Sequence, residues 1–338
     1  MPVDVSARIV RLPLAETFRI ARETSDSAEV VQVEIRHGDT VGFGEAAPIE
    51  RYDQTASSAL AYLEANADAL GADPWALDEI HGRLPHGEPA ARSALDAALH
   101  DLCGKLAGVP VWKLLGLRRE GPPTSWTIGI GDPDEMARKA ERDAPRFKRL
   151  KLKLGGGDGL DVERVRAVRS VTELPLQVDV NEGWTQEEAF DALPQLGELG
   201  VAYCEQPLPA GDPGGAELKR ASRLPIYVDE DCHTLGDVAA CAEIAHGINV
   251  KLAKSGGLRE AMRMASAARA LGLGLMLGCM VESGLGIAPG AHIGALFDHV
   301  DLDGNILIRE DPWPGIELVD GVQMPSATGP GLGVSPRG

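Results

Sequence analysis

Residues 147–157 read FKRLKLKLGGG, and the fold can be worked out from this stretch. Its short apolar run ends at three glycines, a pattern typical of a β-strand followed by a loop. Alternate residues of a strand share one face, so Lys151 and Lys153 point the same way. An isolated pair of this kind is most often part of a solvated edge strand. Two adjacent ammonium groups also lower each other's pKa, however, and a neutral lysine is a general base.

The segments after this strand decide between the two interpretations. Four more short apolar runs end in a charged residue, at intervals of 22–26 residues, namely at Asp179, Glu205, Asp229 and Lys251. Polar stretches rich in alanine and leucine fill the intervals and have a helical pattern. A repeated strand and helix of this length predicts a parallel α/β barrel of the TIM type. The carboxyl ends of barrel strands form one mouth, so we expect three carboxylates to converge there with lysines on either side.

Length and composition exclude several classes of protein. With 338 residues the chain is long enough for a barrel of about 200–250 residues and one smaller domain. Its net charge of −18 argues against nucleic acid and anionic membranes as partners. No apolar run has the length of a membrane span, and the first residues lack a basic, apolar leader. Five cysteines without CxxC spacing indicate free thiols, so we expect a cytoplasmic protein, with a homo-oligomer left open.

The chain divides at a segment rich in glycine and proline near residue 120. Residues 3–14 and 28–47 have the alternation of antiparallel strands, joined by a polar loop that contains Arg19, Arg22, Thr24 and Ser25. Helical patterns follow over residues 55–70, 75–84 and 89–115. We therefore predict an α+β capping domain over residues 1–120, a barrel over 121–320 that starts with a strand at 124–130, and a tail over 321–338, with little helical pattern, that returns to the cap.

The predicted mouth has the ligands of a magnesium site. Asp179, Glu205 and Asp229 offer only oxygen donors, which favours Mg²⁺ or Mn²⁺ over zinc. A metal-bound substrate carboxylate stabilises the charge that develops when the α-proton leaves. Lys153 on the second strand and Lys251 on the sixth are expected on opposite sides of the mouth, as a 1,1-proton transfer requires.

These motifs resemble the enolase superfamily, within it the muconate-lactonising-enzyme subgroup, which includes o-succinylbenzoate synthases and dipeptide epimerases. The matching segments are Lys151-Leu152-Lys153, Asp179-Val180-Asn181, Glu205-Gln206-Pro207, Asp229-Glu230 and Lys251-Leu252-Ala253-Lys254. The resemblance covers essentially the whole chain and implies a modified (β/α)7β barrel with an N-terminal α+β capping domain. It also implies that Lys153 and Lys251 are the acid/base pair. Lys151 would neutralise the substrate carboxylate and lower the pKa of Lys153.

Within the subgroup, Asp301-Leu302-Asp303 resembles the Asp-x-Asp motif of dipeptide epimerases, which binds a substrate's free α-ammonium. Muconate and succinylbenzoate carry no cation, so two aspartates would repel them. Residues 19–22, 228–234, 277–280 and 301–304 are similar to those of bacterial L-Ala-D/L-Glu epimerases. The similarity implies that Arg22, or Arg19 on the same loop, meets the distal carboxylate, and that Cys279 and Met280 contact the substrate. Asp231 departs from the family, which has serine there.

The remaining residues have supporting or structural interpretations. We expect Asn181 to support the metal ligands, and Lys254 to point away from Lys251 in a similar supporting role. Tyr52 and Trp184 are expected to pack, and His233 is not needed as a ligand. The rival functions are o-succinylbenzoate synthesis, N-acylamino-acid racemisation, muconate cycloisomerisation, and a non-catalytic barrel that binds a metal or sugar acid. Mere binding needs no opposed pair of lysines, so we predict an epimerase.

Overall fold

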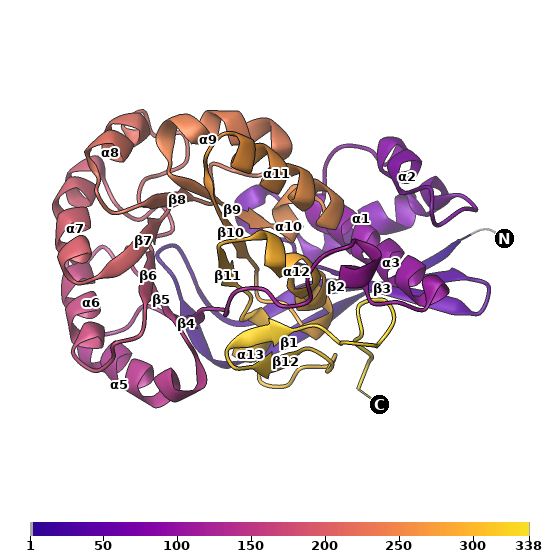
Figure 1. The fold of residues 1–338 in the computed structure, drawn as a ribbon, viewed down its shortest axis with the longest axis horizontal. Helices are drawn as coiled ribbons and strands as arrows, with labels where there is room; N and C mark the ends of the chain where they lie inside the picture. Colours follow the sequence, from indigo (N-terminus) through magenta and orange to yellow (C-terminus); the bar gives the residue numbers. More distant parts are fainter. Residues whose placement is uncertain (1–2, 338) are drawn as a thin grey trace.

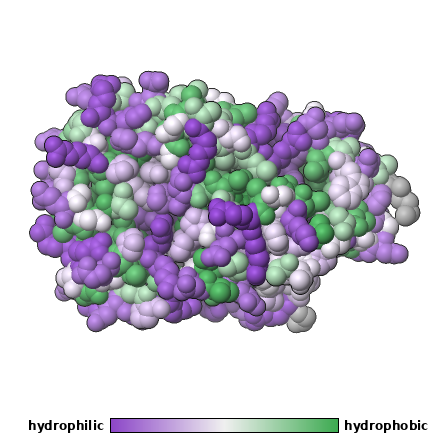
Figure 2. Space-filling view, in the orientation of Figure 1, coloured by the Kyte–Doolittle hydropathy of each residue, from purple (hydrophilic) through white to green (hydrophobic). Residues whose placement is uncertain are grey.

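The computed structural model describes residues 3–337, and Figure 1 shows a barrel with a smaller sheet-and-helix part beside it. Met1 and Pro2, part of the segment judged to lack a leader, lie outside this range, as does Gly338. Within residues 3–337, none of the helices combines the length and apolarity needed to cross a membrane. On the face drawn in Figure 2, hydrophilic side chains predominate, with smaller hydrophobic areas between them.

The N-terminal part, here called the cap, is built on an antiparallel sheet. Its strands β1 (Asp4–Arg19), β2 (Thr24–His37) and β3 (Thr40–Ala46) lie in that order, which confirms the predicted meander. The predicted loop is wrong in extent, because β1 and β2 pair again after an irregularity between Pro13 and Phe18, as far as Arg19 and Thr24. The ladder satisfies the backbone of this polar segment, so it needs no apolar alternation. Only the turn Ile20–Glu23 is left, closed by a 3.0 Å hydrogen bond from the Ile20 amide to the Glu23 carbonyl.

The hairpin made by β1 and β2 extends beyond the cap and reaches over the barrel (Figure 1). The Arg19 carbonyl accepts a 2.8 Å hydrogen bond from the amide of Ile130, which lies just after the first barrel strand. This contact holds the hairpin tip at the barrel mouth.

The helices of the cap pack on one face of its sheet. A β-carbon at Gly44 would lie 2.0 Å from the Ala94 carbonyl oxygen, so glycine there allows this close approach. The continuous helix predicted over residues 89–115 is wrong, because Gly108 adopts a left-handed φ of 70° and Pro110 has no amide to continue it. The elements are η1 (Glu50–Tyr52), α1 (Ala56–Ala65), η2 (Ala67–Leu70), α2 (Leu77–Arg83), α3 (Pro89–Ala107) and α4 (Val111–Leu114).

Eight parallel strands form the barrel, in the sheet order β11-β10-β9-β8-β7-β6-β5-β4. The two edges meet through a bridge between Thr124 and Val300, which nearly closes the sheet and confirms the (β/α)7β prediction. The first strand is shorter than predicted. The strands are β4 (Trp126–Ile128), β5 (Leu150–Lys153), β6 (Leu176–Asp179), β7 (Val201–Glu205), β8 (Ile226–Val228), β9 (Gly247–Lys251), β10 (Gly274–Gly278) and β11 (His299–Asp301).

Successive side chains of a barrel strand point alternately outward, into the apolar core under the helices, and inward, into the barrel. In β5, Leu150 and Leu152 are fully buried in an apolar cluster with residues of α5 and α6, whereas Lys151 and Lys153 point into the barrel. The helices lie outside the sheet (Figure 1). They are α5 (Pro133–Asp143), η3 (Ala144–Arg146), α6 (Asp161–Arg169), α7 (Gln186–Glu198), α8 (Gly215–Ala221), η4 (Leu235–Asp237), α9 (Val238–Ile244), α10 (Leu252–Ser255), α11 (Leu258–Ala270), α12 (Gly284–Ile293), η5 (Gly294–Leu296) and α13 (Gly304–Leu307).

The C-terminal segment contains a hairpin that the sequence did not reveal. Strands β12 (Glu317–Val319) and β13 (Val322–Met324) are too short to leave a clear alternation. The Gly321 carbonyl between them accepts a 2.8 Å hydrogen bond from the Thr124 amide of the barrel. The chain then crosses to the cap, where the Leu332 amide donates to Asp101 Oδ1 at 2.7 Å.

Candidate active site

The charged residues predicted from the strand spacing lie together at the carboxyl end of the barrel. Lys153, Asp179, Glu205 and Lys251 are the last residues of their strands, and Asp229 follows β8 directly. The register pairs Lys153 with Asp179, and Asp179 with Glu205. Parallel pairing therefore stacks charged side chains side by side around the mouth.

Lys151 lies among three carboxylates inside the mouth. Its Nζ is 3.0 Å from Asp179 Oδ2 and 2.8 Å from both Glu205 Oε2 and Asp301 Oδ2. Lys153 Nζ lies 2.6 Å from Asp179 Oδ2 and 3.1 Å from the side-chain oxygen of Asn181. The two lysines of the strand thus share Asp179.

Lys251 approaches from the other side of the barrel. In the sheet order, three strands separate β9 from β5. Lys251 Nζ lies 2.8 Å from Asp229 Oδ2. Lys254 was expected to point elsewhere, but the turn of α10 brings its ammonium to Asp229 Oδ1 and, at 2.8 Å, to the Cys232 carbonyl. Both lysines of the second motif therefore contact Asp229.

The carboxylates dominate the electrostatics of the mouth. Burial alone would lower the pKa of Lys151, but the charges of Asp179, Asp301 and Glu205 together raise it well above its ordinary value. Burial likewise opposes, and Asp229 and Glu205 favour, the charged form of Lys251, whose pKa is raised. The prediction that adjacent ammonium groups lower their pKa is therefore wrong for Lys151. Attraction to three carboxylates exceeds repulsion from one neighbouring lysine.

The residues expected to hold Mg²⁺ fit such an ion by chemistry and burial. Among residues 3–337, no trio of histidine, cysteine, aspartate or glutamate side chains is spaced to hold a metal. Lys151 Nζ lies within ion-pair distance of both Asp179 and Glu205. Glu205 Oε2 and Asp229 Oδ2 are nonetheless buried without a hydrogen bond. Each is 2.8 Å from a lysine nitrogen, which is ion-pair distance but not hydrogen-bond geometry. Buried oxygens of this kind suit a hard cation.

Backbone and side-chain amides hold the carboxylates and the backbone that carries them. Asn181 donates its backbone amide to Asp179 Oδ1 at 3.0 Å, and Asn249 donates to Glu205 Oε1 at 2.7 Å. Gln206 Oε1 accepts from the Asp229 and Glu230 amides at 2.8 and 2.9 Å. Sequence reasoning gave Gln206 and Asn249 no role. Gln206 was visible only as part of Glu-Gln-Pro, and Asn249 lies inside a strand without a motif.

A second pair of carboxylates lies beside Lys151. Asp303 Oδ2 accepts a 2.7 Å hydrogen bond from the Thr127 amide, and Asp301 pairs with Lys151. Burial first, and then the charge of Asp301, raises the pKa of Asp303 to about 7. One negative charge close to Lys151 and a second, readily protonated carboxyl group thus face the same space.

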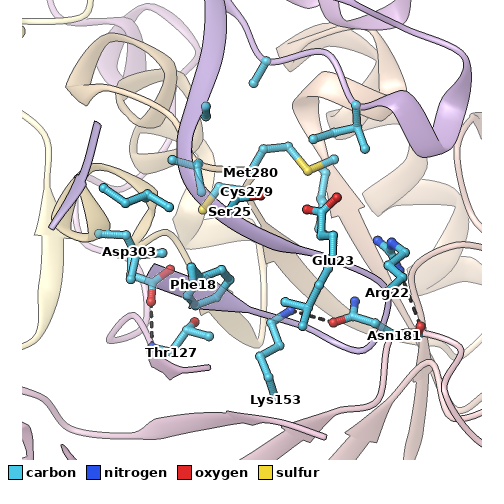
Figure 3. A pocket seen from close by; sticks show the side chains of 18 of the residues that line it. Phe18, Arg22, Glu23, Ser25, Thr127, Lys153, Asn181, Cys279, Met280 and Asp303 are labelled. Carbon is cyan, nitrogen blue, oxygen red and sulfur yellow. Dashed lines mark hydrogen bonds between the residues drawn. The ribbon is translucent and has the colours of Figure 1, made fainter. Parts of the chain in front are cut away.

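A cavity of about 250 Å³ lies between these carboxylates and the hairpin tip. Arg22, Cys279 and Met280, which we expect to contact the substrate, line it, and so does Tyr52, which was expected only to pack. Arg22 Nη1 lies 2.8 Å from Glu230 Oε1, and its side chain is 28% exposed. Arg19 is not part of the lining. Figure 3 shows Arg22 and Asn181 on one side of the cavity and Asp303 and Thr127 on the other.

The other residues considered from the sequence lie outside this space. Trp184 is buried and donates to Asp161 at 2.7 Å, and His233 packs edge-on against Tyr52 at 4.5 Å. Asp231 accepts from Gln206 at 2.7 Å and from the Gly211 amide at 2.8 Å, which holds it on the outer side of the loop. Its extra charge therefore does not face the cavity.

Comparison with known proteins agrees with this geometry. Residues 3–116 match the "Mandelate racemase / muconate lactonizing enzyme, N-terminal domain" family, and residues 135–338 match the "Enolase C-terminal domain-like" family. The L-Ala-D/L-Glu epimerase of Bacteroides thetaiotaomicron is 39% identical over 96% of this chain and 85% of its own length. The hydrophobic dipeptide epimerase of Roseobacter litoralis is 38% identical over 96% of this chain and 95% of its own.

A solved structure extends the similarity to three dimensions. The dipeptide epimerase of Enterococcus faecalis V583, complexed with Mg and L-Leu-L-Tyr, superposes with a TM-score of 0.94 at 31% identity, over 99% of this chain and 100% of that one. Both the family matches and the relatives cover nearly the whole chain. The chain therefore belongs to the enolase superfamily and, within it, to the group of dipeptide epimerases.

Proposed function

We propose that this protein is a Mg²⁺-dependent epimerase of L-Ala-D/L-Glu that inverts the α-carbon of the C-terminal residue. One observation carries the proposal: two buried lysines, Lys153 and Lys251, approach the same cluster of carboxylates from strands on opposite sides of the barrel. Inversion needs one group to remove a proton and another to return it on the opposite face. A metal-binding barrel without catalysis would need neither.

Asp179, Glu205 and Asp229 would hold the ion, and Mn²⁺ could replace Mg²⁺. Asn181, Asn249 and Lys254 would keep these three carboxylates in position. When bound, the ion supplies positive charge that stabilises the substrate carboxylate as the α-proton leaves. The carboxylates that raise the pKa of Lys251 are these same proposed ligands. If these carboxylates held the ion, Lys251 would lose part of the attraction that keeps it protonated and would be able to act as a base.

The two ends of the cavity support a dipeptide with an acidic second residue. Asp301 and Asp303 are suited to the α-ammonium, and Lys151 to the carboxylate at the reacting carbon. Arg22 lines the far side and is suited to a distal carboxylate, to which an arginine donates two parallel hydrogen bonds. Cys279 and Met280 line the wall between them. Muconate and succinylbenzoate lack an ammonium and would be repelled by the two aspartates.

The relatives support both this substrate and a broader one. The Bacteroides relative is an L-Ala-D/L-Glu epimerase, and the Roseobacter relative is a hydrophobic dipeptide epimerase. Arg22 at the cavity wall favours the acidic dipeptide, which peptidoglycan turnover supplies. The five free cysteines, four of them buried, suit a reducing cytoplasm.

Incubation with L-Ala-L-Glu and Mg²⁺ in D₂O, followed by NMR, tests the proposal. The expected result is loss of the glutamate α-proton signal and appearance of L-Ala-D-Glu. N-acetyl-L-Ala-L-Glu, which lacks the ammonium, should be inert. Exchange in the acetylated compound, or none in any free dipeptide, would rule out the assignment.

A further inference from the structure

A second cavity adjoins the candidate active site. It has a volume of about 420 Å³, larger than the first, and lies between β1, β4 and α5. The two cavities share only Leu14, Phe18, Thr127 and Leu307 among their lining residues. These four side chains therefore form the wall between them.

That wall stands beside the proposed ammonium site. Thr127 lines both cavities, and its amide holds Asp303 at 2.7 Å. Figure 3 shows Phe18 next to Thr127 and Asp303, on the side away from Arg22. The side chain of the first residue of a dipeptide leaves from the carbon that carries the ammonium. An ammonium bound at Asp301 and Asp303 therefore places the start of this side chain close to the wall.

The second cavity is apolar near the wall, whereas the rest of its lining includes the cations Lys139, Arg142 and Arg146 and the anions Glu16 and Asp143. Leu14, Phe18, Ile128 and Leu307 contribute apolar surface. Among the charged groups, Arg142 pairs with Asp143 at 2.8 Å and with Glu16 at 2.9 Å. An occupant that enters from the active site thus meets apolar surface before any charge.

We propose that this cavity is a subsite for a large apolar side chain of the first residue of the dipeptide, with Phe18 as its movable wall. The inference rests on the proposed function, since it takes the ammonium to lie at Asp301 and Asp303. It adds dipeptides such as L-Phe-L-Glu and L-Leu-L-Glu to the substrate class. Phe18 is only partly buried and belongs to the hairpin, whereas Leu14 and Thr127 in the same wall are buried.

The test compares kcat/KM for L-Phe-L-Glu and L-Ala-L-Glu in three variants. Ala15 lines the second cavity and not the first, so Ala15→Trp fills the subsite. We expect it to lower the Phe-Glu to Ala-Glu ratio about tenfold, as pocket differences of a few methylene groups do. Phe18→Ala should raise the ratio by a similar factor, and adding Ala15→Trp should cancel that gain. Ala61→Trp, on an exposed position of α1 in the cap, is the matched control and should leave the ratio unchanged.

Occupancy is also measurable without turnover, because Trp126 lines only the second cavity. Binding of L-Phe-L-Glu should change the tryptophan fluorescence, whereas L-Ala-L-Glu should not, and Trp126→Phe should abolish the difference. Equal ratios in the parent and Ala15→Trp proteins, or equal fluorescence responses to both dipeptides, would overturn the subsite. Loss of all turnover with the fluorescence difference intact would instead contradict the proposed function and leave the subsite standing.

Discussion

Arg22 and Glu230 join the cap to the barrel by an ion pair of 2.8 Å at the edge of the candidate active site. The Glu230 side chain is fully buried, whereas that of Arg22 is 28% exposed. Burial first, and then the charge of Asp229, raises the pKa of Glu230 to about 7. Glu230 therefore holds the Arg22 side chain in place, while part of that side chain remains exposed at the cavity.

This arrangement predicts a selective loss in Arg22→Met. An arginine that binds the distal carboxylate contributes a charge-assisted hydrogen bond of about 1.5–3 kcal/mol. We expect kcat/KM for L-Ala-L-Glu to fall by about ten- to a hundredfold, and that for L-Ala-L-Leu to change much less. Arg19→Met is the matched control, because Arg19 belongs to the same hairpin but does not line the cavity. Equal losses for both dipeptides would mean that Arg22 is structural, and the substrate would become an unspecified dipeptide.

The two lysines should fail in different ways. Lys251→Ala should abolish epimerisation in both directions and keep α-proton exchange for the one enantiomer that faces Lys153. Lys153→Ala should show the reverse selectivity. Loss of a general acid or base costs about 10²–10⁴ in rate. Deuterium incorporation into each enantiomer, followed by NMR, measures both effects.

Lys254→Met provides the comparison for this experiment. Lys254 also contacts Asp229, but on the side of the Cys232 carbonyl. Its loss should slow exchange of both enantiomers alike. Full epimerase activity in either the Lys153 or the Lys251 variant contradicts the assignment.

The sequence was most informative where charge interrupts an apolar repeat. Asp179, Glu205 and Lys251 end buried strands at regular intervals, and a charge at that position is rare without a function. Parallel pairing then places the strand ends together, so the mouth follows from spacing alone. The barrel and the composition of its mouth were predictable for this reason.

Contacts between distant segments left no such pattern. Thr127 supports Asp303 through its backbone amide, which any residue except proline provides. The pairing of Arg22 with Glu230 joins residues 208 positions apart. The renewed pairing of β1 and β2 beyond the irregularity between Pro13 and Phe18 likewise depends on backbone hydrogen bonds and not on side-chain alternation.

Asp303 predicts a pH dependence of substrate binding. Its pKa of about 7 reflects burial and Asp301, opposed by the Thr127 hydrogen bond and by Lys151. Below this pH the neutral carboxyl group attracts an ammonium less, so KM for the dipeptide should fall as pH rises through about 7. Asp303→Asn should keep a high KM at every pH. Glu230 and Glu282, whose pKa values are also about 7, are present in both proteins, so the difference between them isolates Asp303.

Titration of Asp303 should also change the stability of the fold, which should fall as pH rises while substrate binding improves. The folded state binds the Asp303 proton more tightly than an unfolded chain with a pKa of about 3.9, so stability falls as pH rises from about 4 to 7. Asp303→Asn removes this loss. The drop in Tm between pH 5 and pH 8, measured without substrate, should therefore be smaller in the variant. An unchanged drop, together with an unchanged KM profile, would show that Asp303 does not titrate in this range.

The last prediction concerns metal binding. In this structure the carboxylates proposed as Mg²⁺ ligands form ion pairs with lysines. Glu205 Oε2 and Asp229 Oδ2 are buried without a hydrogen bond. Chelation should abolish α-proton exchange, and added Mg²⁺ should restore it.

Isothermal titration should show Mg²⁺ binding about 10–100-fold weaker in Asn249→Ala than in the parent protein, since Asn249 donates a 2.7 Å hydrogen bond that orients Glu205. Glu205→Gln, which removes a ligand and not merely its support, should lose at least as much affinity. Asp303→Asn is the matched control: it removes a buried carboxylate from the same mouth but should keep Mg²⁺ affinity while losing dipeptide affinity. Equal Mg²⁺ affinity in the parent and Glu205→Gln proteins would exclude Glu205 as a ligand.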